Sequence, residues 1–177
     1  MKKILLVVVV FAWSCKTSVE PLEENELITT VKMNFENGGV VKTFSFKDPD
    51  GDGGASPTLD KIVLDKSKTY NLTLEFFDES KSPVLNITDE ILDAADEHLV
   101  AFTLTPSTLG KYTYSDKDKN GFNIGLKGTF ETLATAGSGK LKVQLRHQPP
   151  INGMISKNGT ITPGSDDVNI DFDIEIK

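Results

Sequence analysis

Apolar and polar residues alternate with a period of two along most of this chain. In segment 168–176, five aliphatic or aromatic residues alternate with Asn, Asp and Glu. Such a period is typical of a β-strand with one buried and one exposed face. The pattern predicts an all-β protein with strands near residues 27–36, 40–46, 59–65, 70–76, 99–105, 112–114, 122–126, 129–133, 140–146 and 168–176.

Turn and helix signals refine this fold class. Asn37-Gly38 and Asn120-Gly121 are strong hairpin signals, because a type I′ turn needs positive φ at both central residues. One short helix is expected after Thr88 as N-cap, with acidic residues in its first turn and an apolar face reaching residue 99. Strands and helices do not alternate, which argues against a parallel sheet. We therefore expect a two-sheet antiparallel, Ig-like β-sandwich with one short helix.

The first residues are typical of a bacterial export signal. Lys2 and Lys3 precede an apolar run over 4–11, which is too short to span a bilayer. The segment 12–15, Ala-Trp-Ser-Cys, resembles a lipoprotein cleavage site. The expected organisation is a signal peptide (1–14), a lipid-anchored acidic tether from Cys15 to residue 26, and a β-sandwich domain (27–177). The alternative is ordinary secretion with an unrelated cysteine.

Composition excludes several classes of function. A net charge of −7 argues against a nucleic-acid partner, which needs clustered Lys and Arg. One cysteine excludes an internal disulfide framework and a Cys-rich metal site. The chain has two histidines and no nucleophile-elbow, zinc-protease or Ser-x-x-Lys motif. We therefore expect a protein that is not an enzyme, and a carboxylate-based hydrolase is the least favoured alternative.

Two Asp-rich loops are candidate calcium sites. Asp48, Asp50 and Asp52 in DPDGDGG resemble the first half of an EF-hand loop, although Leu59 stands where the bidentate Glu is needed. A weaker candidate combines residues of the second loop, Asp116, Asp118 and Asn120. Lysines at 117 and 119 would oppose a cation there. In both loops the alternative is an Asx-rich turn, in which short polar side chains cap the backbone.

The two histidines form a third candidate. His147 shares strand parity with the core residues of segment 141–145, and His98 lies at the edge of the apolar face of the expected helix. With Asp96 or Glu97, they could hold one transition-metal ion if the two rings lie within roughly 8 Å of each other. The alternative is that each histidine is half-buried and makes one hydrogen bond.

Several segments together resemble small envelope lipoproteins of Bacteroidota. These are the lipid signal, FKDPDGDGG, LDKIVL, ADEHLVAF, YSDKDKNGFNIGLK and KLKVQLRHQP. Some of these proteins carry the name of the type 1 periplasmic-binding fold, a bilobal α/β fold that does not fit this short β-patterned chain. The resemblance implies an outer-membrane location, on the periplasmic or the cell-surface side, and a TonB-dependent outer-membrane transporter as partner.

Two functions follow as expectations. The first is a lipid-anchored, non-enzymatic binding or accessory lipoprotein of the bacterial outer membrane, serving uptake of a metal ion or small ligand. The second is a structural or adhesion β-sandwich module stabilised by calcium.

Overall fold

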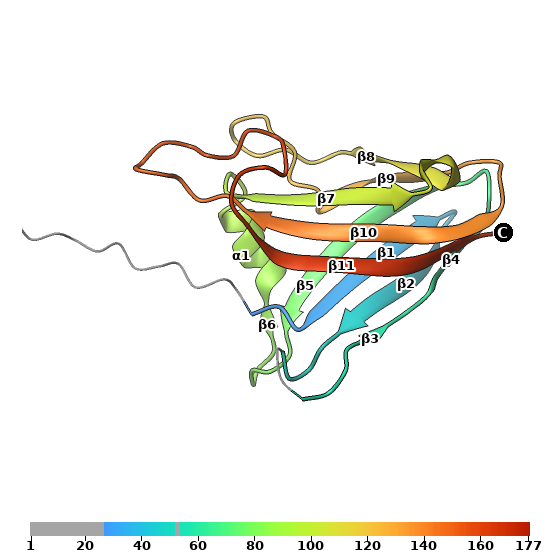
Figure 1. The fold of residues 1–177 in the computed structure, drawn as a ribbon, viewed down its shortest axis with the longest axis horizontal. Coiled ribbons are helices and arrows are strands. Elements are labelled where there is room, and N and C mark those ends of the chain that lie inside the picture. Colours follow the sequence, from blue (N-terminus) through green and yellow to red (C-terminus); the bar gives the residue numbers. More distant parts are fainter. Residues whose placement is uncertain (1–26, 52–53) are drawn as a thin grey trace, which may run out of the picture.

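Two β-sheets packed face to face make up the structure, with one α-helix at one end (Figure 1). This computed structural model describes residues 27–51 and 54–177. Within these residues one sheet has seven strands, in the order β3-β2-β1-β5-β9-β8 with β6 beside β5, and the other has four, in the order β4-β11-β10-β7. The predicted all-β sandwich is therefore confirmed.

The elements are short and follow one another closely along the chain. The seven-stranded sheet contains β1 (Thr30–Asn37), β2 (Val40–Lys47), β3 (Thr58–Leu59), β5 (Thr69–Asp78), β6 (Leu85–Asn86), β8 (Gly110–Tyr114) and β9 (Lys127–Thr132). The four-stranded sheet contains β4 (Ile62–Leu64), β7 (His98–Thr105), β10 (Gly137–His147) and β11 (Ser165–Ile176). The helical elements are α1 (Ile87–Asp93) and a 3₁₀ turn, η1 (Ser107–Leu109).

Neighbouring strands are antiparallel with one exception. The short strand β4 runs parallel to β11, and Ile62 pairs with Ile174. Only two residues separate β3 from β4, so the chain passes there from one sheet to the other. The inward side chains of β4, Ile62 and Leu64, are fully buried, which explains why so short a strand is held against β11.

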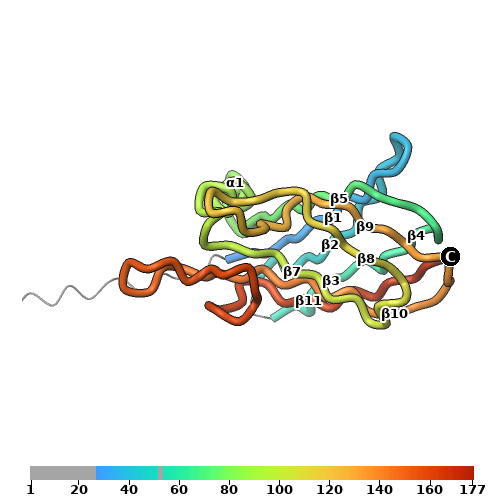
Figure 2. The backbone as a smooth tube through the Cα atoms, turned by 90° about the horizontal axis from the view of Figure 1, so that it is seen from above, coloured from blue at the N-terminus to red at the C-terminus, as the bar shows by residue number. Residues whose placement is uncertain are grey.

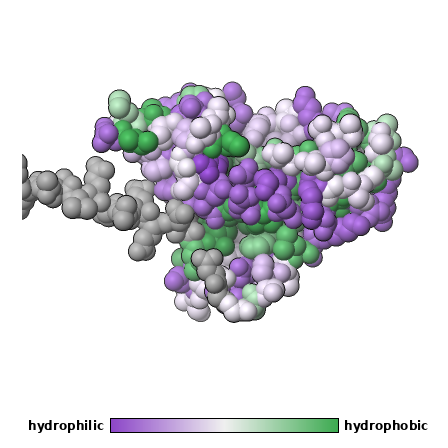
Figure 3. All heavy atoms as spheres, viewed as in Figure 1, coloured by the Kyte–Doolittle hydropathy of each residue, from purple (hydrophilic) through white to green (hydrophobic). Residues whose placement is uncertain are grey.

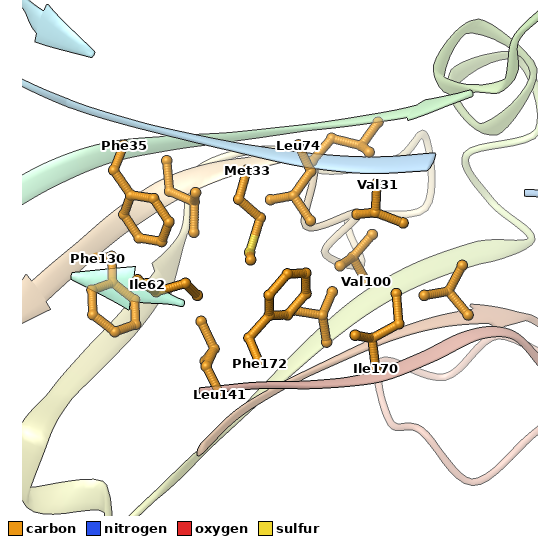
Figure 4. Close-up of a cluster of buried hydrophobic side chains, with 14 of the residues drawn as sticks. Val31, Met33, Phe35, Ile62, Leu74, Val100, Phe130, Leu141, Ile170 and Phe172 are labelled. Carbon is orange, nitrogen blue, oxygen red and sulfur yellow. The ribbon is translucent and has the colours of Figure 1, made fainter. Parts of the chain in front are cut away.

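The core lies between the two sheets and comes from the alternation seen in the sequence. Val31, Met33 and Phe35 of β1 are fully buried and point toward the opposite sheet (Figure 4). Leu141 of β10 and Phe172 of β11 point back at them and are also fully buried. The outward residues of β11 are polar, so this strand has the two-faced character that its sequence predicts.

The first hairpin turn lies one residue later than expected. Asn37 pairs with Val40, so the two-residue loop is Gly38-Gly39. Both glycines have positive φ, 61° and 82°. A type I′ turn requires this conformation at both positions, and two glycines adopt it more readily than Asn-Gly.

The helix begins earlier and ends earlier than expected. Its N-cap is Asn86, whose side chain accepts a hydrogen bond from the Thr88 amide. The predicted N-cap, Thr88, instead bonds through its hydroxyl to the backbone of Phe76 in β5. The helix ends at Asp93, residues 94–97 form a turn, and Leu99, which was expected on the apolar face of the helix, lies in β7.

Three segments gather at the end of the sandwich where α1 lies, here called the helix end (Figures 1 and 2). They are α1 with the turn after it, the β8–β9 connection (115–126) and the β10–β11 connection (148–164). Hydrogen bonds join them, including Gln148 N to Glu97 O at 2.6 Å and Lys157 Nζ to Ala95 O at 2.8 Å. No helix in the described part of the chain is long and apolar enough to cross a membrane.

Candidate metal centre

Two histidines face each other across neighbouring strands at the helix end. His98 is the first residue of β7, His147 is the last of β10, and the two are direct partners in the antiparallel register. Their rings are stacked, with centroids 4.8 Å apart and planes inclined by 6°. The structure therefore brings together the two residues that the sequence paired, well within the roughly 8 Å that a shared ion requires.

The position of His98 differs from the expectation. It lies in a strand rather than at the edge of the helix, because α1 ends at Asp93 and residues 94–97 form the turn into β7. His98 is 2% exposed, and the three residues that follow it in β7 are also buried. Cross-strand pairing with β10 therefore sets the approach of the two rings, and the His98 ring also bonds to the carbonyl of Ala94, the residue that follows α1.

A third side chain, which sequence analysis did not identify, completes the cluster. Asp167 lies in β11, where the register with β10 shifts: Leu145 pairs with Val168, but Arg146 pairs with Asp166. Asp167 is thus the extra residue of a β-bulge. Bulges turn a side chain away from the direction that strict alternation would give it. By simple parity Asp167 belongs with the outward acids of β11, yet its side chain is fully buried beside His98.

The tautomer of His98 follows from one hydrogen bond. Its Nδ1 lies 3.0 Å from the carbonyl oxygen of Ala94, which can only accept, so Nδ1 donates. In the neutral ring Nε2 then carries the lone pair, and this atom lies 3.9 Å from Oδ2 of Asp167. Metal-bound histidines are commonly oriented in this way by a backbone carbonyl on the other ring nitrogen.

Asp167 is an unusual carboxylate. Its side chain is 0% exposed, and neither oxygen has a hydrogen-bond partner among the described residues. Burial raises the pKa of Asp167 to about 6, although His147 and Arg146 nearby oppose the rise. A buried carboxylate without donors is costly unless a cation compensates it. The side chain therefore destabilises the metal-free fold and is suited to a positive partner.

We expect Asp167→Asn to stabilise the metal-free protein at pH 7 relative to wild type. The folded pKa lies above the unfolded value, so the folded state retains a proton that the unfolded state loses between about pH 4 and pH 6. Wild-type stability should therefore fall, relative to the variant, as the pH rises through that window, by about 2–3 kcal/mol in total. Chemical denaturation of both proteins with a chelator present, from pH 4 to pH 8, measures this difference.

Other polar and charged groups lie near the same point, so only the difference between the two proteins is informative. His98, His147, Arg146 and Asp166 lie around the carboxylate, and Glu97 lies beside His147. They are present in both proteins and largely cancel in the comparison. A variant that is less stable than wild type at every pH would show that Asp167 stabilises the metal-free fold.

The three side chains can converge on one ion. One ligand atom from each of His98, His147 and Asp167 can be chosen so that all lie within 4.8 Å of one another. Zinc bonds of about 2.0–2.1 Å place tetrahedral ligand atoms about 3.3 Å apart, so the rings must turn out of their stack to close the site. Glu97 lies beside this cluster, with Oε2 3.8 Å from His147 Nε2.

The two acids predicted to join the histidines have different environments. Glu97 lies beside His147, as expected. Asp96 instead pairs with Lys119 of the β8–β9 connection at 2.9 Å, and this ion pair lowers the pKa of Asp96. Asp96 therefore serves to join two segments of the helix end.

A cavity of about 430 Å³ adjoins the cluster. Asp166 and Asp167 line it from β11, and Asp48, Ile28 and Phe46 line it from the other sheet. Asp167 thus belongs both to the histidine cluster and to the wall of this cavity. The Asp167 carboxylate is itself 0% exposed, and Asp166 is paired with Arg146 at 2.6 Å.

The first Asp-rich loop is only partly described. Asp48 lines the cavity, whereas Asp50 is exposed and its Oδ2 accepts a hydrogen bond from the Ala55 amide at 2.8 Å. Asp52 lies outside the described residues. This bond ties the Asp50 carboxylate to the backbone of its own loop, five residues further on, and calcium binding by this loop stays a prediction.

The second Asp-rich loop already uses its carboxylates. Asp116 accepts hydrogen bonds from the amides of Gly125 and Lys127, both at 2.9 Å. Asp118 accepts from the amides of Asn120 and Phe122 and forms a fully buried ion pair with Lys157 at 2.8 Å. The Asn120 side chain is exposed. An ammonium group therefore lies where the weaker calcium prediction places a metal ion.

Cys15, the predicted site of lipidation, lies outside the described residues. Comparison of the chain with known protein families, with curated proteins and with solved structures found no match.

Proposed function

We propose that this protein is a lipid-anchored metal-binding protein of a bacterial envelope, which holds one transition-metal ion at His98, His147 and Asp167. The convergence of these three side chains from β7, β10 and β11 carries the proposal. The lipid anchor rests on the Ala12–Cys15 segment and on the apolar run before it.

The donor set favours zinc or a similar transition metal over calcium. Two imidazole nitrogens and one carboxylate suit zinc, copper, nickel or iron, whereas calcium takes six to eight oxygen ligands. The oriented tautomer of His98 also fits an imidazole that binds through Nε2.

Burial favours binding over catalysis. The side chains of His98, His147 and Asp167 are 2%, 12% and 0% exposed. A catalytic metal keeps a coordination position that substrate can reach, and these values leave little room for one. An accessory role in metal uptake, beside an outer-membrane transporter, is the function in which such a site would serve a lipoprotein.

Titration with metal ions tests the proposal directly. The purified chain is titrated with Zn²⁺, Co²⁺ and Ca²⁺ by calorimetry, and Co²⁺ also reports four-coordinate nitrogen and oxygen ligands by its visible absorption. We expect one site for Zn²⁺ and Co²⁺ that weakens as pH falls, because bound ligands must be deprotonated. Asp96→Ala is the matched control, since this acid pairs with Lys119 and should leave affinity unchanged.

The proposal is wrong if Zn²⁺ binds no more tightly to wild type than to His147→Ala. If zinc does bind there, the rate of zinc transfer to a chelator distinguishes a role in metal uptake from a purely structural role. An ion that serves uptake must leave the folded protein, whereas an ion that only stabilises the sandwich leaves on the timescale of unfolding.

The anchor is tested separately. Cys15→Ala should move the protein from the detergent-rich phase to the aqueous phase, because the thiol that would carry the lipid is removed. Phase partitioning of wild type and variant, with the mass of each chain, measures this. Equal partitioning of the two would contradict the lipoprotein assignment and leave the metal site standing.

A further inference from the structure

The β10–β11 connection projects from the helix end and has an apolar tip. It leaves the body of the sandwich in both views (Figures 1 and 2), and hydrophobic residues are visible on this projection in Figure 3. Ile151, Met154, Ile155 and Ile161 are 61%, 69%, 58% and 46% exposed. Residues 149–164 are called the projecting loop below.

The projecting loop presents no charge to solvent. Residues 149–164 contain neither Asp nor Glu, in a chain whose net charge is −7. Its one charged residue is Lys157, whose fully buried side chain pairs with Asp118 and donates to Ala95 O. Negative charge opposes contact with a membrane, and the projecting loop lacks the negative charge that the rest of this acidic protein carries.

Hydrogen bonds hold the loop in the conformation that exposes these aliphatic side chains, which lie beside exposed polar residues such as Asn152 and Asn158. At the tip, Ile151 and Met154 exchange backbone hydrogen bonds of 2.9 and 3.0 Å. At the base, the buried side chain of Gln148 donates to the carbonyl of Thr160, and Ser156 Oγ donates to Gln148 O. The aliphatic side chains are thus displayed by a built turn, which favours an apolar partner phase.

The chain enters the domain at this same end. Leu27 lines the same cavity as Asp166 and Asp167, and the blue start of the described chain lies toward the helix end (Figures 1 and 2). Twelve residues lead from Cys15 to Leu27, and so few can span at most about 40 Å. A lipid on Cys15 would therefore hold the helix end within about 40 Å of the bilayer surface.

We infer that the projecting loop inserts its aliphatic tip into the lipid surface to which Cys15 is anchored. This rests on the lipid-anchor part of the proposed function and is independent of the metal site. Uncharged aliphatic groups partition into the headgroup and acyl boundary, about 5–10 Å deep. This second contact would fix the orientation of the domain relative to the lipid surface.

A single-site probe tests this in the acylated protein. Acylation consumes Cys15, the only cysteine, so Met154→Cys provides one free thiol for an environment-sensitive dye. The labelled protein is reconstituted in phospholipid vesicles that contain lipids with quenchers on their acyl chains. Val40→Cys, 63% exposed in the β1–β2 hairpin at the opposite end, is the matched control.

We expect blue-shifted emission and acyl-chain quenching at position 154, and neither at position 40. Adding Ile155→Asp to the Met154→Cys protein should return the dye to water, because a carboxylate opposes insertion. Emission at 154 equal to that at 40 in acylated protein overturns the inference alone. A dye that is shielded but not quenched by the lipids shows contact between copies of the chain and also overturns it. A chain whose mass shows no acyl group removes the anchor, and this inference with it.

Discussion

Zinc is expected to raise the free energy of unfolding of the wild-type protein by about 4 kcal/mol when free zinc is about a thousandfold above its dissociation constant. The gain arises because the ion binds three side chains that lie together in the folded protein. The unfolded chain has no such site. His98→Ala removes a ligand that is already oriented by Ala94, and it should abolish the gain. Calorimetric unfolding with zinc and with chelator, on both proteins, measures it.

Two comparisons make the result specific. Asp96→Ala should keep the full zinc effect, because that acid pairs with Lys119 outside the cluster. Asp167→Asn should lose the stabilisation by zinc, yet it should be more stable than wild type in the absence of metal. If zinc stabilises His98→Ala as much as wild type, the ion binds elsewhere and the three-residue site is refuted.

The second large effect concerns the buried ion pair of Lys157 and Asp118. Lys157→Met should destabilise the fold by about 3–5 kcal/mol, because it leaves a fully buried carboxylate without its cation. Burial acts to raise the pKa of Asp118, and the hydrogen bonds from Lys157 and the Phe122 amide more than offset it, so the pKa lies below its usual value. The contribution of the pair is therefore present at neutral pH and lost as pH falls below about 4.

Urea denaturation at pH 7 measures this loss. The double variant Lys157→Met with Asp118→Asn should recover part of it, since neither charge is then left unpaired. Lys119→Met is the surface control: its partner is Asp96, its side chain is 72% exposed, and its loss should cost far less stability than the loss of Lys157. Equal effects of the two lysine variants would show that the buried pair is no more important than the exposed one.

Periodicity predicted the fold class because each long strand has one buried face. Val31, Met33 and Phe35 are buried while the residues between them are more exposed, and the same is true along β11. The pattern fails over 122–126, which was expected to be a strand. Ile124 and Leu126 are buried there, but Ile124 O accepts from Val100 N and Leu126 O from Leu74 N. The segment bonds to both sheets in turn and forms no continuous ladder with either.

The sequence indicated the two histidines but not the acid that joins them. His147 could be placed by strand parity, whereas Asp167 breaks parity through the bulge between Leu145 and Arg146. The one local signal is the run Asp166-Asp167-Val168, where two acids interrupt the alternation of β11. The pairing of Lys157 could not be predicted either, because nothing else in its loop is charged and its partner, Asp118, lies 39 positions earlier in the chain.

The bulge in β11 has a consequence for how such a site could be gained or lost in evolution. Beyond the extra residue, from Val168 to Ile176, the strand keeps its register with β10 and its buried side chains. Removing one residue at position 167 would restore continuous pairing with Arg146 and leave that core unchanged. Deletion of one codon would therefore give a sandwich of the same architecture that has two stacked histidines and no third ligand. No substitution in the core would be needed.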